Sequence, residues 1–182
     1  MKYILILIAQ RVFILALLSY NMKEGETHVI WGVVRIALGL IFLWAFFDKL
    51  IGLGFATAAD KSWLLGNSPT YGFLAKGVHG PLAEFYNSLA SSVLVEWLFM
   101  LGLLFIGISL TFGIFMGLGC ASGFVMMFLM WAALLPPANH PFIDDHVIYA
   151  LVLVGLWASR AGHVIGLGRA WEKISIVRKW KL

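Results

Sequence analysis

The amino-acid sequence predicts an all-α integral membrane protein, a bundle of four transmembrane helices with one long loop region and a basic tail. Of its 182 residues, 62% are hydrophobic and 12% are charged, whereas soluble domains carry roughly 25% charged residues. Its mean hydropathy is +0.93. Because a transmembrane helix needs about 20 apolar residues, the chain has room for about four or five spans. We therefore expect no separate soluble domain.

The first 21 residues form an apolar run with Arg11 at its centre. An arginine at that depth costs about 2.5–3.5 kcal/mol on the insertion scale, and it splits the run into pieces too short for a signal peptide. The polar stretch after Met22 is typical of a start before a membrane helix. We predict that residues 1–21 are a non-native extension and that translation begins at Met22. An interfacial or fifth helix and a cleaved signal are the alternatives.

The first predicted span covers residues 29–47 and ends before the charged pair Asp48-Lys49. Residues 50–91 then form a connection of 42 residues that is too polar to span a membrane. Within it, residues 81–90 begin with proline and place apolar side chains on one helical face, which is typical of an interfacial helix.

An uncharged stretch of 47 residues extends from Trp97 to Ile143. As one helix it would measure about 70 Å, more than twice the thickness of the hydrocarbon core, so it must reverse direction. The polar and glycine residues at 111–113 mark the reversal. We predict spans at residues 92–110 and 114–135, the latter ended by Pro136-Pro137. The fourth span covers residues 143–159. The whole of residues 22–182 then forms one domain.

The distribution of lysine and arginine predicts the orientation. Seven of these residues, Lys23 and six between Arg160 and Lys181, flank the spans on the side of the two chain ends, against three on the other side. Positive flanks stay in the cytoplasm, so we expect both termini to be cytoplasmic in a cell-membrane protein. The tail combines basic residues with Trp171 and Trp180, which favours a lipid surface rather than nucleic acid. A docking site for a soluble partner is the alternative.

Ionisable residues at membrane depth are costly, so each is a candidate functional residue. Depth along the helices predicts a polar cluster of Lys49, Glu96, His146 and an aspartate beneath the outer surface. Two interpretations stay open: the groups neutralise each other and fix helix packing, or they handle protons and substrate. The candidate catalytic residues are Glu96, His146 and Asp145, and the candidate substrate-binding residues are Lys49, Arg35 and Tyr149.

Other motifs favour structural roles. Cys120 has no second cysteine to pair with, and the acidic residues lack the paired motifs of dinuclear metal sites, so we expect no metal. The pairs Gly113/Gly117 and Gly119/Gly123 have the spacing that lets membrane helices approach closely. We interpret them as packing within one bundle, with a homo-oligomer as the alternative.

Four segments carry a resemblance to a known family. They are residues 35–42 followed by 48–50, Glu96-Trp97 with Leu101-Gly102 behind it, residues 136–146, and residues 166–169 followed by Trp171. With these segments the chain resembles the DoxX/DoxD-like membrane proteins over roughly residues 22–180, and more closely the DoxD-type subunit of thiosulfate:quinone oxidoreductases.

The resemblance implies a membrane subunit that passes electrons from a sulfur compound such as thiosulfate to quinone, alongside a second small redox subunit. Glu96 or His146 would relay protons, and Lys49 would attract the anionic donor. The sequence holds no flavin, haem or iron–sulfur motif, which disfavours catalysis by this chain alone. The alternative is a non-catalytic scaffold whose basic tail recruits a cytosolic partner. A transporter is disfavoured, because no internal repeat is apparent.

Overall fold

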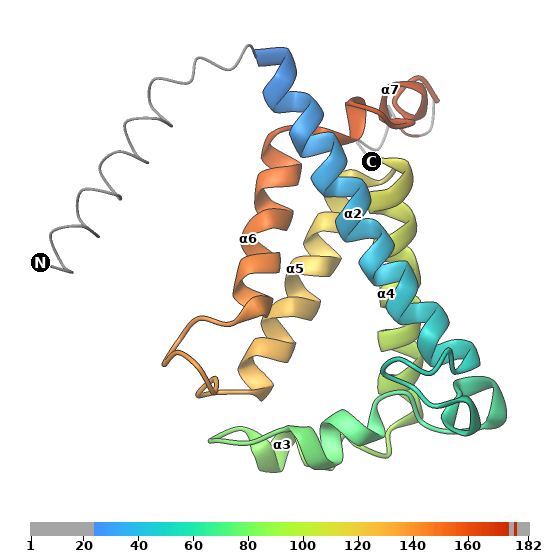
Figure 1. The fold of residues 1–182 in the computed structure, drawn as a ribbon, viewed down its shortest axis with the longest axis vertical. Coiled ribbons are helices and arrows are strands. Elements are labelled where there is room, and N and C mark those ends of the chain that lie inside the picture. Colours follow the sequence, from blue (N-terminus) through green and yellow to red (C-terminus); the bar gives the residue numbers. More distant parts are fainter. Residues whose placement is uncertain (1–23, 175–176, 178–182) are drawn as a thin grey trace, which may run out of the picture.

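The computed structural model describes residues 24–174 and residue 177, and this part of the chain is helical and contains no β-strand (Figure 1). The predicted extension at residues 1–21 and most of the basic tail after Ile174 lie outside the described residues. The elements, in order, are α2 (Glu24–Ile51), η1 (Ala59–Lys61), η2 (Trp63–Leu65), η3 (Phe73–Gly77), α3 (Ala83–Ser88), α4 (Val93–Phe112), α5 (Met116–Ala133), α6 (Asp145–Ala158), η4 (Ala161–His163) and α7 (Gly168–Trp171).

Three of the predicted spans are confirmed as long apolar helices. Thr27–Ile51 of α2, Val93–Phe112 and Met116–Ala133 are long and apolar enough to cross a membrane. Each of these helices carries large apolar side chains, and many of these side chains are exposed on the surface of the molecule, as expected for contact with lipid. The fourth predicted span falls on α6, whose 14 residues measure about 21 Å.

The end of the first helix lies four residues beyond the predicted one. The backbone amide of Gly52 still donates to the carbonyl of Asp48 at 2.9 Å, so the charged pair Asp48-Lys49 belongs to the last turn of α2. Gly52 stops the helix with a φ of 70°, and a Cβ there would lie 2.7 Å from the Ala58 carbonyl oxygen. The prediction took the charges as the boundary, whereas the glycine sets it.

Helix α2 packs along α4, α5 packs along α6, and α4 contacts α5. The main core contains buried side chains from all of these helices, among them Phe42, Ile106, Met127 and Leu153. Small residues permit the close contacts. A Cβ on Gly39 of α2 would lie 2.6 Å from the Thr111 nitrogen of α4.

The predicted pair Gly119/Gly123 lies at contacts between helices. A Cβ on Gly119 would lie 2.5 Å from Cβ of Ser109 in α4, and one on Gly123 would lie 2.9 Å from Leu153 of α6. Both glycines are buried within the chain. Their spacing therefore serves contacts inside this molecule.

The two ends of the helix assembly differ. At one end, η4 and α7 fold back over the turn between α4 and α5 (Figure 1). At the other end, the connection between α2 and α4 carries α3, which lies within the segment predicted as an interfacial helix. Tyr86 of α3 is buried in a second, smaller apolar cluster with Leu74, Ala90 and Ala133. This cluster joins the connection to the end of α5.

Candidate functional site

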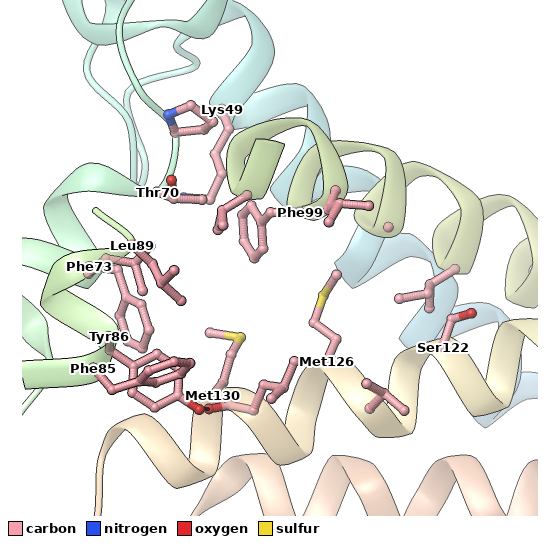
Figure 2. A pocket seen from close by; sticks show the side chains of 18 of the residues that line it. Lys49, Thr70, Phe73, Phe85, Tyr86, Leu89, Phe99, Ser122, Met126 and Met130 are labelled. Atoms are coloured by element: carbon pink, nitrogen blue, oxygen red, sulfur yellow. Dashed lines mark hydrogen bonds between the residues drawn. The ribbon is translucent and has the colours of Figure 1, made fainter. Parts of the chain in front are cut away.

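A cavity of about 840 Å³ lies between α4, α5 and the connection that carries η3 and α3. Its volume is in the range of small-molecule sites. The walls are almost wholly apolar, with Phe73, Phe99, Met126 and Met130 among the lining residues (Figure 2). Leu98 and Val125, which also line it, are more than half exposed on the outer faces of α4 and α5. The cavity therefore reaches the apolar surface of the molecule.

Lys49 is the charged residue among those that line this cavity. The last turn of α2 places it beside α4, where its Nζ lies 5.9 Å from the centre of the Phe99 ring. This distance allows a cation–π interaction. Lys49 forms no ion pair within the described residues. Figure 2 shows it beside Thr70 at one side of the cavity. The cavity is thus an apolar chamber with one cationic edge.

The aromatic wall of the cavity is held by Tyr86, which is 8% exposed. Its hydroxyl donates to the Leu129 carbonyl of α5 at 2.8 Å. Burial raises the pKa of the Tyr86 phenol, so the hydroxyl stays protonated and remains a donor. This bond joins α3 to α5 at the wall of the cavity, where both residues are lining residues.

Glu96 lies in the first turn of α4 and is partly buried. It does not line the cavity, and no ion pair within the described residues joins it to Lys49. Glu96 precedes Phe99 by one helical turn, so it stands next to the cavity wall. The predicted Lys49–Glu96 contact is therefore not formed.

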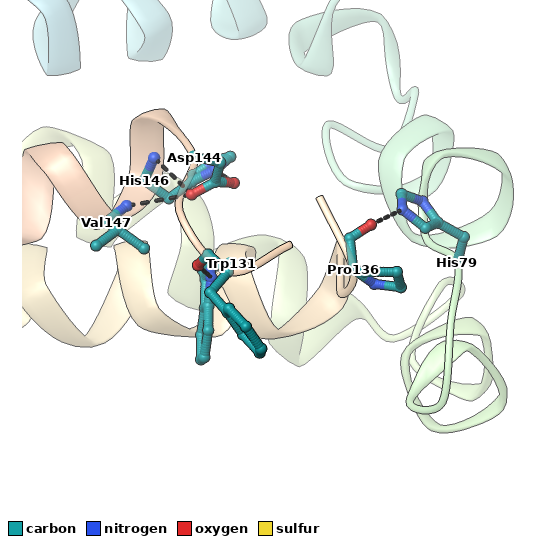
Figure 3. A network of polar contacts seen from close by, with 7 residues as sticks. His79, Trp131, Pro136, Asp144, His146 and Val147 are labelled. Carbon is teal, nitrogen blue, oxygen red and sulfur yellow. Dashed lines mark hydrogen bonds and ion pairs between the residues drawn. The ribbon is translucent and has the colours of Figure 1, made fainter. Parts of the chain in front are cut away.

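His146 belongs to a separate polar network at the start of α6 (Figure 3). The carboxylate of Asp144 caps this helix, accepting from the amides of His146 at 3.0 Å and Val147 at 3.2 Å. Nδ1 of His146 lies 2.7 Å from Oδ2 of Asp144. Asp145 is exposed, and Tyr149 packs against the main core. The structure thus places His146, Asp145 and Tyr149 away from the cavity lining that contains Lys49.

Arg35 lies at the other end of α4 from Glu96. Its side chain is fully buried, and its guanidinium donates to the carbonyls of Leu110 and Thr111 at the end of α4, the latter at 3.1 Å. It also donates to the carbonyls of Ile165 at 2.9 Å and Val164 at 3.4 Å. It lies far from Glu96, because some 14 residues of α4, about 21 Å along the helix, separate Glu96 from Leu110. Arg35 binds backbone instead.

The sequence did not predict several residues at and near the site. Thr70, Tyr86 and Met130 line the cavity, but only Tyr86 lay on a predicted amphipathic face. Asp48 is 2% exposed, and its Oδ1 accepts from the Phe55 amide at 3.2 Å. The burial of Asp48 could not be foreseen, because it depends on how the connection folds over the end of α2.

Comparisons of the chain with protein-family models, with curated proteins and with solved structures found no match. The class that the fold supports is an all-helical membrane protein. The resemblance to DoxX/DoxD-like proteins stays a prediction.

We expect Tyr86→Phe to lower the free energy of unfolding by about 0.5–1.5 kcal/mol, because it removes the hydrogen bond to Leu129. The loss should depend on pH. A phenol whose pKa is raised by folding stabilises the protein below its unfolded value of about 10 and loses that contribution as the pH rises further.

Thermal unfolding in detergent between about pH 8 and pH 11 checks this pair of expectations. The two proteins should differ at the lower pH and converge at the higher one. A constant difference across the range would contradict the assignment.

Proposed function

We propose that the chain crosses the cell membrane four times, with α6 and its flanking residues as the fourth span and both termini in the cytoplasm. The charge distribution supports this orientation, since seven basic residues flank one side and three flank the other. The connection that carries α3 then faces outward.

Cysteine labelling tests the orientation in a Cys120→Ala background. Asn67→Cys and Lys173→Cys place single thiols at exposed positions on opposite sides of the proposed topology. A membrane-impermeant maleimide applied to intact cells should label the first variant and leave the second unlabelled until the cells are opened. Labelling of both from outside would contradict the four-span topology.

We also propose that the cavity at Lys49 binds a quinone and that the protein is the membrane subunit of a quinone-linked oxidoreductase. The observation that carries this proposal is the cavity itself. It is apolar, has a volume in the range of small-molecule sites, reaches the apolar surface of the molecule, and carries one cation at its edge. A quinone has matching parts, namely an apolar ring and tail with carbonyl oxygens.

Each residue has a defined task in this proposal. Lys49 donates a hydrogen bond to one quinone carbonyl, and the Thr70 hydroxyl stands beside it as a second polar group. Phe73, Phe99 and Met126 contact the ring and exclude water. The tail enters from the bilayer beside Leu98 and Val125, which line the cavity and are exposed on the surface.

A quinone bound in this cavity would supply the acceptor for two electrons and two protons. The family resemblance supports a sulfur compound such as thiosulfate as the electron donor and a second small subunit as the carrier. Glu96, one turn before Phe99, is the proposed proton donor to the cavity. His146, held by Asp144, is proposed to exchange protons with the outer solution.

We expect Lys49→Met to weaken quinone binding by about tenfold to one hundredfold, the usual effect of removing a hydrogen bond from a charged donor. The matched control is Lys61→Met, which removes an exposed lysine outside the cavity. Each purified protein is titrated in mild detergent with a short-tailed quinone. Quenching of tryptophan fluorescence reports the binding.

Organic extraction of the protein purified from membranes provides the second readout. Extracts of the unaltered chain and of Lys61→Met should contain quinone, and those of Lys49→Met should contain much less. If the unaltered chain neither retains nor binds quinone, the proposal fails. Co-purification of a cytosolic protein without quinone would then favour the scaffold.

A further inference from the structure

A second cavity, of about 650 Å³, lies at the opposite end of the helices and has no task in the proposed function. Its walls come from the turn between α4 and α5, the end of α6, η4 and α7. Three ionisable side chains line it, Arg160, His163 and Glu172. Its lining is therefore far more polar than that of the quinone cavity.

The charged side chains of this second cavity are not all paired with one another. Nε2 of His163 lies 2.8 Å from Oε1 of Glu172, so the carboxylate already has a partner. Arg160 forms no ion pair with any other residue that the structure describes. One positive charge is thus left available to a ligand.

Further hydrogen-bond donors border the same space. Helix α5 begins at Met116, and the preceding Phe115 supplies no side-chain cap, so the amides of the first turn lack partners within the helix. Met116 and Gly117 both line the cavity. The indole nitrogen of Trp171, also a lining residue, is buried with no acceptor among the described residues.

The cavity is open beside Gly117 in the first turn of α5. A Cβ added to Gly117 would meet only the Trp157 indole nitrogen, at 3.9 Å. Next to the cavity, Leu118 of α5 and Val154 and Trp157 of α6 are exposed apolar side chains. Tryptophan favours the level of the lipid headgroups. A donor-lined pocket thus adjoins exposed apolar side chains of α5 and α6.

We propose that this cavity binds the phosphate group of an anionic phospholipid. Arg160 and the first-turn amides of α5 donate to the phosphate oxygens, and the acyl chains lie along Leu118, Val154 and Trp157. The site is distinct from the quinone cavity, and its existence does not depend on quinone binding.

Native mass spectrometry of the full chain, delipidated in mild detergent, tests the proposal. The probes are dioleoyl-phosphatidylglycerol, dioleoyl-phosphatidylcholine and inorganic phosphate, each titrated separately. Arg160→Asn is the test variant, because asparagine tolerates the left-handed backbone at this position, where φ is 49°. Arg169→Asn is the matched control, since Arg169 is exposed but does not line the cavity.

The unaltered protein should retain one phosphatidylglycerol, bound about tenfold more tightly than phosphatidylcholine. Arg160→Asn should abolish that preference, and Arg169→Asn should preserve it. A second variant, Gly117→Asp, places a carboxylate among the donors, where it suits a helix N-terminus, and should also abolish lipid retention without loss of folding.

Three outcomes would overturn the proposal. The first is equal weakening by Arg160→Asn and Arg169→Asn, which would show a diffuse attraction to the basic surface. The second is equally strong binding of inorganic phosphate, which would show a site for a free anion. The third is no preference for phosphatidylglycerol in the unaltered protein.

Discussion

One end of the molecule depends on the hydrogen bonds that the buried guanidinium of Arg35 donates to backbone carbonyls. A charge removed from water costs several kcal/mol unless hydrogen bonds replace its hydration. Here the replacement consists of backbone carbonyls at the end of α4 and in the loop at residues 164–165. The carbonyl end of a helix carries partial negative charge, so the arginine and α4 stabilise each other. None of the described residues pairs a carboxylate with the guanidinium, and of its three nitrogens only Nε lacks a hydrogen-bond partner among them.

These hydrogen bonds, here called the Arg35 clamp, constrain the residues next to the guanidinium. A Cβ on Gly113 or on Gly166 would lie 2.9 Å from a nitrogen of the Arg35 guanidinium. It would also lie 2.8 Å or 2.7 Å, respectively, from the backbone oxygen of Gly162, so glycine is required at both positions. The loop that contains Gly166 leads into α7, and the Leu167 amide donates to the Phe112 carbonyl at 2.8 Å. The clamp thereby positions α7 over the end of α4, which builds the wall of the cavity proposed to bind a phospholipid. The cavity proposed to bind quinone lies at the opposite end, where α3 is attached through Tyr86.

The helices were predictable because their signal is local. Composition, the length of the uncharged stretch and the prolines at 136–137 were enough to place three apolar helices within a few residues. The partners of the ionisable groups were not predictable. The sequence predicted Lys49 and His146 as neighbours of Glu96 and a substrate-binding role for Arg35. Arg35 instead binds backbone carbonyls, which leave no trace in the sequence. Lys49 was singled out for its depth, but Thr70 and Tyr86 come from a connection whose path only tertiary packing determines. Function stays a proposal, drawn from the cavity and from a resemblance.

Amide hydrogen exchange in Arg35→Lys tests the central role of this clamp most directly. Lysine keeps the positive charge, but one ammonium group cannot replace the two arms of the guanidinium that bind α4 and the loop together. We expect the Leu167 amide and its neighbours in residues 162–168 to exchange about tenfold faster or more, while amides of α3 keep their protection. Unchanged exchange at Leu167 in the variant would contradict the account, because it would show that α7 stays in place without the arginine.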